Sequence, residues 1–90
     1  MKFSIAHVRD VIGFRITVLL QAEAAESISE VSTELDSFSL GRDTLNPAET
    51  QYTRAFSQAG GFTPGAEHTV KVTATIAGGL EKTASDRWND

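Results

Sequence analysis

The sequence predicts an all-β protein, built as an antiparallel β-sandwich of six to seven short strands. Three observations support this fold class. Apolar and polar residues alternate with a period of two in several segments, and these segments are rich in β-branched residues. Turn-forming residues separate the segments at intervals of about ten residues. Two stacked antiparallel sheets with an apolar layer between them are the expected product of such a pattern.

The length and composition of the chain predict a single domain, residues 1–90. A chain of 90 residues has room for one core, and its apolar fraction of 40% and charged fraction of 22% are close to globular averages. It contains no cysteine, so neither a disulfide framework nor a thiolate metal site is available. The formal net charge of −4 argues against a uniformly basic surface for nucleic acid or anionic lipid.

The first two strands are predicted at residues 2–8 and 14–24. In the first segment, Phe3, Ile5 and His7 share one side of the strand. The second segment alternates over eleven residues, which is typical of a strand with one face in the core. The side chains expected on its core face are those of Phe14, Ile16, Val18, Leu20, Ala22 and Ala24.

Residues 20–38 fit two structures. Apolar residues recur at steps of three and four, as in an amphipathic helix. As a strand, the same segment would point Val31, Thr33 and Leu35 inward. The outward side chains would then include Ser32, Glu34 and Asp36. The many serines and threonines lower the helix propensity, but the residues alone leave both alternatives open.

The turns are predicted from glycine and proline. Residues 39–49 are expected to form a loop, in which Gly41 permits a positive φ and Asn46-Pro47 favours an extended turn. Pro64-Gly65 fits the central positions of a type II turn.

Three more strands are predicted in the remainder of the chain. Tyr52 and Phe56 share one side of a strand at residues 50–57, with Arg54 between them. The next strand alternates clearly, and its core side chains are those of Val70, Val72, Ala74 and Ile76. Gly78-Gly79 is predicted to form a hairpin turn into a last strand at residues 80–88.

Two parts of the chain resemble known families of sandwich domains. "FTPGAEHTVKVTA", residues 62–74, resembles the fibronectin type III passage that enters the central strand, with His68 in the place of the usual corner tyrosine. The chain is also similar to bacterial immunoglobulin-like modules. The matching positions are Ile28, Val31, Pro64, Gly65, His68, Val70, Val72 and Ala74. The resemblance implies an immunoglobulin-like (fibronectin type III-like) sandwich used for spacing, adhesion or recognition, and it favours the strand for residues 20–38.

An acidic stretch supplies the candidate interaction residues. Five acidic residues and no Lys or Arg lie between Ile16 and Gly41. Such a stretch is typical of a solvated acidic face, and it also suits a calcium-binding edge or a docking surface for a basic partner. The residues predicted to form an interaction surface are Glu30, Glu34, Asp36, Arg42 and Asp43.

The sequence contains no motif for catalysis. His7 and His68 lack metal-ligand spacing, and neither a nucleophile elbow nor a phosphate loop is present. We therefore expect a chain that is not an enzyme and has no cofactor or metal. The expected function is that of a non-catalytic structural or protein-interaction module. The alternative is a glycan- or calcium-binding module of a surface or virion protein.

The expected partner is a protein, either a second copy or a larger assembly. A glycan is also possible, whereas nucleic acid and membrane insertion are not expected. No segment approaches the run of about 18 apolar residues that a membrane helix requires, and no signal peptide is recognised. Export is therefore expected only as part of a larger protein or assembly.

Overall fold

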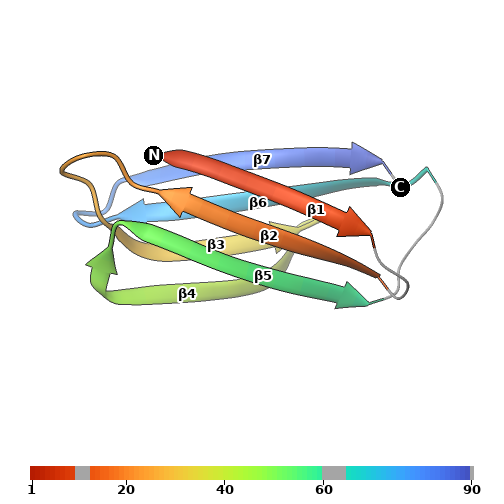
Figure 1. Ribbon diagram of the computed structural model, residues 1–90, viewed down its shortest axis with the longest axis horizontal. Helices are drawn as coiled ribbons and strands as arrows, with labels where there is room; N and C mark the ends of the chain where they lie inside the picture. The colour runs from red at the N-terminus through yellow and green to blue at the C-terminus, as the bar shows by residue number, and fades with distance from the viewer. Residues whose placement is uncertain (10–12, 60–64, 90) are drawn as a thin grey trace.

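The computed structural model describes residues 1–9, 13–59 and 65–89, and it confirms the predicted all-β fold. Two antiparallel sheets lie one on the other, with the core between them (Figure 1). One sheet has the order β1-β2-β5 and the other the order β4-β3-β6-β7. The seven strands are β1 (Lys2–Arg9), β2 (Gly13–Gln21), β3 (Ile28–Leu35), β4 (Phe38–Glu49), β5 (Gln51–Ala59), β6 (Glu67–Ile76) and β7 (Glu81–Asn89).

The core comes mainly from β2, β3 and β6, where the predicted alternation is confirmed. The side chains that are at most 1% exposed include those of Ile16, Val18, Leu20, Ile28, Val31, Val70, Val72 and Ala74. Residues 28–35 form a strand and not a helix, with Val31, Thr33 and Leu35 turned inward. Ala24 differs from the prediction and is exposed, because β2 ends at Gln21 and the chain then turns.

The prediction of a loop at residues 39–49 is wrong, because Phe38–Glu49 is a strand. The turn that precedes it is formed by Asp36 and Ser37, whose φ angles are 50° and 73°. Two positive φ angles in a two-residue connection are typical of a tight hairpin. Strand β4 lies at the edge of its sheet and pairs only with β3, with two shifts in register. An edge strand tolerates glycine, proline and bulges, and this is why loop-like residues form a strand here.

Gly41 has a different role from the predicted one. It is not among the residues with a positive φ. A Cβ atom at this position would lie 2.9 Å from Nη1 of Arg54 and 3.1 Å from Cε1 of Phe56. Glycine therefore leaves room for the close packing of β4 against the side chains of Arg54 and Phe56 on β5.

The predicted hairpin turn at Gly78-Gly79 is confirmed. The two φ angles are 109° and 102°, and the Gly79 N–H donates to the carbonyl of Ile76 at 2.9 Å. Gly65 has a φ of 82°, which fits the second central position of a type II turn. Pro64 lies outside the described residues.

Thr33 places a polar hydroxyl in the apolar core, and its replacement by Val is expected to stabilise the protein. Its side chain is fully buried, and its hydroxyl has no hydrogen-bond partner within the described part of the chain. A buried polar group without a partner costs about 1–3 kcal/mol, and valine has nearly the same shape. We expect Thr33→Val to raise the free energy of unfolding by about 1 kcal/mol in urea titrations. Thr73→Val, on the outer face of β6, is the matched control, and an equal gain in both variants would contradict the explanation.

Candidate functional site

Three of the five predicted interaction residues share the outer face of the four-stranded sheet. Glu30 and Glu34 lie on β3, and Arg42 lies opposite Ser32 on β4. Arg42 forms an ion pair with Glu30, with 2.8 Å between Nε and Oε1. The structure therefore brings these three side chains together on one polar surface.

Asp43 points to the other side of β4, since neighbouring residues of a strand face opposite ways. Its carboxylate accepts hydrogen bonds from the Tyr52 hydroxyl and from Nη1 of Arg54, the latter at 2.8 Å to each oxygen. These hydrogen bonds, first the one from Tyr52 and then that from Arg54, lower the pKa of the Asp43 carboxyl. Asp43 thus joins the edges of the two sheets and does not belong to the polar surface.

Asp36 lies in the turn between β3 and β4 and holds this turn against β6. Its Oδ1 accepts the Thr69 N–H at 2.8 Å, and its Oδ2 lies 2.7 Å from Nδ1 of His68. His68 is buried and packs against Phe14, with 5.0 Å between the ring centroids. The Asp36–His68 pair therefore holds the β3–β4 turn against β6 and the core. No sequence motif indicates this contact, because 32 residues separate the two side chains.

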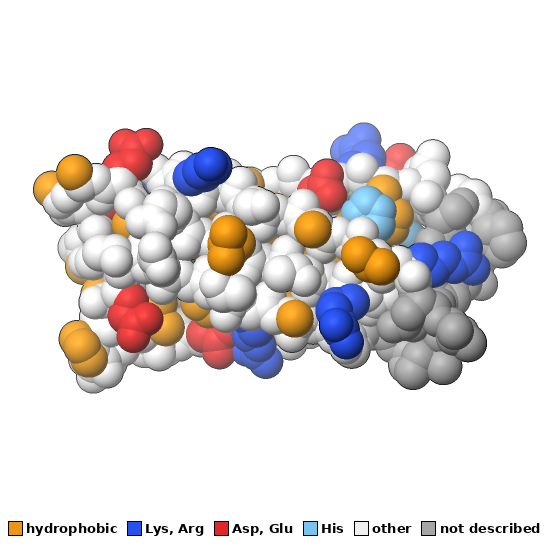
Figure 2. Space-filling model, viewed as in Figure 1, with side chains coloured by type: hydrophobic (Ala, Val, Ile, Leu, Met, Phe, Trp, Pro, Cys, Tyr) orange, Lys and Arg blue, Asp and Glu red, His pale blue; other side chains and the backbone are white. Residues whose placement is uncertain are grey.

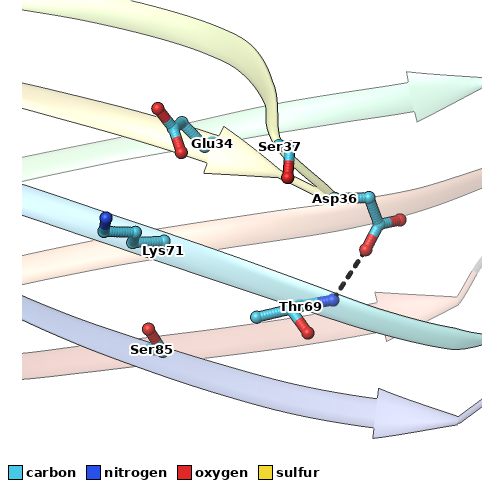
Figure 3. A pocket seen from close by; sticks show the side chains of 6 residues that line it. All are labelled: Glu34, Asp36, Ser37, Thr69, Lys71 and Ser85. Carbon is cyan, nitrogen blue, oxygen red and sulfur yellow. Dashed lines mark hydrogen bonds between the residues drawn. The ribbon is translucent and has the colours of Figure 1, made fainter.

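A hollow of about 360 Å³ lies beside this turn, on the outer face of the four-stranded sheet (Figure 3). Glu34 on β3 lies directly opposite Lys71 on β6, and neither side chain forms an ion pair among the described residues. The lining residues are Glu34, Asp36, Ser37, Thr69, Lys71 and Ser85. A second hollow of about 220 Å³ shares Glu34 and also contains Glu30 and Arg42.

These hollows offer hydrogen bonds and single charges to a ligand. In residues 1–9, 13–59 and 65–89, no three His, Asp or Glu side chains are grouped so that they could hold a metal ion. No helix in the same residues is long and apolar enough to cross a membrane.

The two open sides of the sandwich are closed by contacts between the sheets. On one side, His7 of β1 stacks on Trp88 of β7 with 4.1 Å between centroids, and its Nδ1 lies 3.7 Å from Oδ2 of Asp86. On the other side, Arg54 of β5 meets Asp43 of β4. All four edge strands therefore turn an ionisable side chain inward, which opposes pairing with strands of other molecules.

The outer face of the three-stranded sheet has a different character, and it faces the viewer in Figure 2. We call it the acid-free face, because none of its described residues is acidic and its only charges are those of Lys2 and Arg15. Val8 and Leu19 are 64% and 48% exposed on it. Its residues are Lys2, Ser4, Ala6, Val8, Arg15, Thr17, Leu19, Gln21, Gln51, Thr53, Ala55 and Ser57.

Sequence reasoning missed the acid-free face, although a signal for it exists. Arg15, Thr17, Leu19 and Gln21 alternate with the core residues of β2, and Leu19 is the apolar exception among them. In the segments 2–8 and 51–57, none of the outward side chains is acidic either. Only the strand order shows that these three segments are neighbours.

Comparisons of the chain with protein-family models, with curated proteins and with solved structures gave no match.

Tyr52, the only tyrosine of the chain, is expected to resist ionisation in the folded protein. Burial, and then the hydrogen bond to Asp43, raise the pKa of its hydroxyl well above the ordinary value of 10.0. A pKa raised by folding gives stability that is complete below the unfolded pKa and is lost as the pH rises through the folded pKa. The phenolate absorbance should therefore appear only at a pH well above 10. Titration of the urea-unfolded chain is the control, and ionisation at the same pH in both states would contradict the expectation.

Proposed function

We propose that the chain is a non-catalytic protein-interaction module with an immunoglobulin-like, fibronectin type III-like sandwich. The strand order supports the fold assignment. In an immunoglobulin-type sandwich, the first, second and fifth strands share one sheet and the third, sixth and seventh share the other. The orders β1-β2-β5 and β3-β6-β7 follow this arrangement, and β4 is added beside β3.

The character of the polar residues supports a non-catalytic role. Asp36 and Asp43 are engaged in contacts between structural elements, and Arg42 pairs with Glu30. His68 is buried beside Asp36. These groups hold the sandwich together, and a catalytic role would require them to be available to a substrate.

The observation that carries the proposal is the contrast between the two outer faces. One carries both acidic and basic side chains, whereas the acid-free face has only two charged side chains, both basic, and two exposed apolar residues, Val8 and Leu19. Sheet faces of this kind are suited to contact with another protein, because little charge is desolvated when they are covered. The inward charges on the edge strands direct association to a face and away from an edge.

Photocrosslinking in the native host tests the proposal. A photoreactive residue is placed at one of four surface positions of the full chain: Thr17 or Ala55 on the acid-free face, or Ser32 or Thr83 on the other face. We expect at least one position to give a discrete adduct with a protein after irradiation. If all four positions give none, the chain has no stable protein partner and the proposed function is wrong.

Glycan recognition is a second candidate function, favoured by the hollow of about 360 Å³. Hydroxyl groups of Ser37, Thr69 and Ser85, with the charges of Glu34 and Lys71, offer both donors and acceptors to sugar hydroxyls. A glycan array with the wild-type chain and with Glu34→Gln tests it. Binding that depends on Glu34 would support a glycan module, and an empty array would remove this candidate.

A further inference from the structure

We infer that the acid-free face binds an acidic surface of another protein, an inference that rests on the proposed function and specifies its partner. Lys2 lies on β1 near one end of this face, opposite Gln21, and Arg15 lies on β2 near the other end, opposite Val8. Six residues at about 3.3 Å each separate the two positions along the sheet, a span of roughly 20 Å. Between the two cations lie Ala6, Thr17, Leu19 and Ala55.

Charge is the first reason to choose an acidic partner. The chain has 12 acidic and 8 basic residues, so its overall potential is negative. The acid-free face is the region where the local sign is reversed. An acidic partner would be repelled by the molecule as a whole and attracted at this face, which fixes the orientation in which it can dock.

The shape of the face is the second reason. Leu19 projects from β2, and a hollow of about 160 Å³ beside it is lined by Leu20, Gln21, Gln51 and Thr53. The Gln51 Nε2 donates to Gln21 Oε1 at 2.8 Å, so one hydrogen bond between these amides is retained when water is excluded. An apolar side chain of the partner fits this hollow, and its carboxylates lie at the two ends of the face.

A second copy of the chain suits this face less well. Two copies placed face to face would bring four cations together without a carboxylate. Two cations are also few for nucleic acid, since specific binding neutralises several phosphates at once.

The photocrosslinking positions give the test of the inference. We expect adducts from Thr17 and Ala55 but not from Ser32 or Thr83, and we expect mass spectrometry to map the crosslink to an acidic segment of the partner. Arg15→Glu in the chain that carries the photoreactive residue at Ala55 should lower the adduct yield about tenfold or more, because it replaces a favourable charge pair with a repulsive one. Arg87→Glu, an exposed arginine on β7, is the matched control and should leave the yield unchanged.

The outcomes separate the inference from the proposed function. Adducts from Ser32 or Thr83 alone would keep the proposed function and overturn the inference. An adduct of twice the mass of the chain would identify a second copy and would also overturn it. An unchanged yield with Arg15→Glu would show that the partner is not recognised by its acidic groups.

Discussion

Replacing Val72 by Asp is expected to prevent folding. Val72 is fully buried in β6, where it lies between Thr33 of β3 and Ala84 of β7. A carboxylate at this position would lie in the apolar layer between the sheets without a cationic partner. Burying such a group costs several kcal/mol, whereas the whole stability of a small domain is about 5–15 kcal/mol. Circular dichroism and a thermal melt should show an unfolded chain.

Thr73→Asp is the matched control for this substitution. Thr73 is the next residue of β6, and its side chain lies on the outer face of the sheet, half-exposed. The same carboxylate should be tolerated there, with a cooperative melt. A Val72→Asp protein that melts cooperatively would contradict the assignment of this side chain to the core, and with it the register of β6.

The sequence could predict those strands in which the alternation of apolar and polar residues is sufficient to identify the buried face. Strands β2 and β6 alternate clearly because one face of each is buried along its whole length. Strand β4 could not be predicted from alternation, because it is an edge strand with a bulged register and contains Gly41 and Pro47. Here the pairing with β3 decides the structure, and local propensity does not.

The candidate surface was harder to predict than the fold, because residues that are close in the sequence do not have to share a face. Arg42 and Asp43 are neighbours, but they lie on opposite sides of β4. Asp36 belongs to a turn, where it binds His68. The contacts that join the two sheets depend on the packing of one sheet over the other, and no short motif contains that information.

The inward charges on the edge strands are expected to prevent these strands from pairing with other molecules, and substitution tests this role. Arg54 lies on the edge strand β5, and its guanidinium pairs with Asp43 of β4 at 2.8 Å. If residue 54 were apolar, the inward side chains of β5 at positions 52, 54 and 56 would contain no charged group. A continuous apolar edge strand is a template for pairing with a strand of another molecule.

The double variant Asp43→Asn/Arg54→Val is therefore expected to fold and to associate through β5. The asparagine keeps an acceptor for the Tyr52 hydroxyl, and replacement of an ion pair by neutral groups is often tolerated. A few new hydrogen bonds between strands, at about 0.5–1.5 kcal/mol each, would raise the association constant about tenfold or more. Sedimentation velocity at increasing protein concentration measures this effect. The matched control is Arg42→Val/Asp43→Asn, which also leaves the net charge at −4 but keeps Arg54 in place. If both variants associate equally, the loss of Asp43 or of any one arginine accounts for the association, and the inward position of Arg54 does not protect the edge.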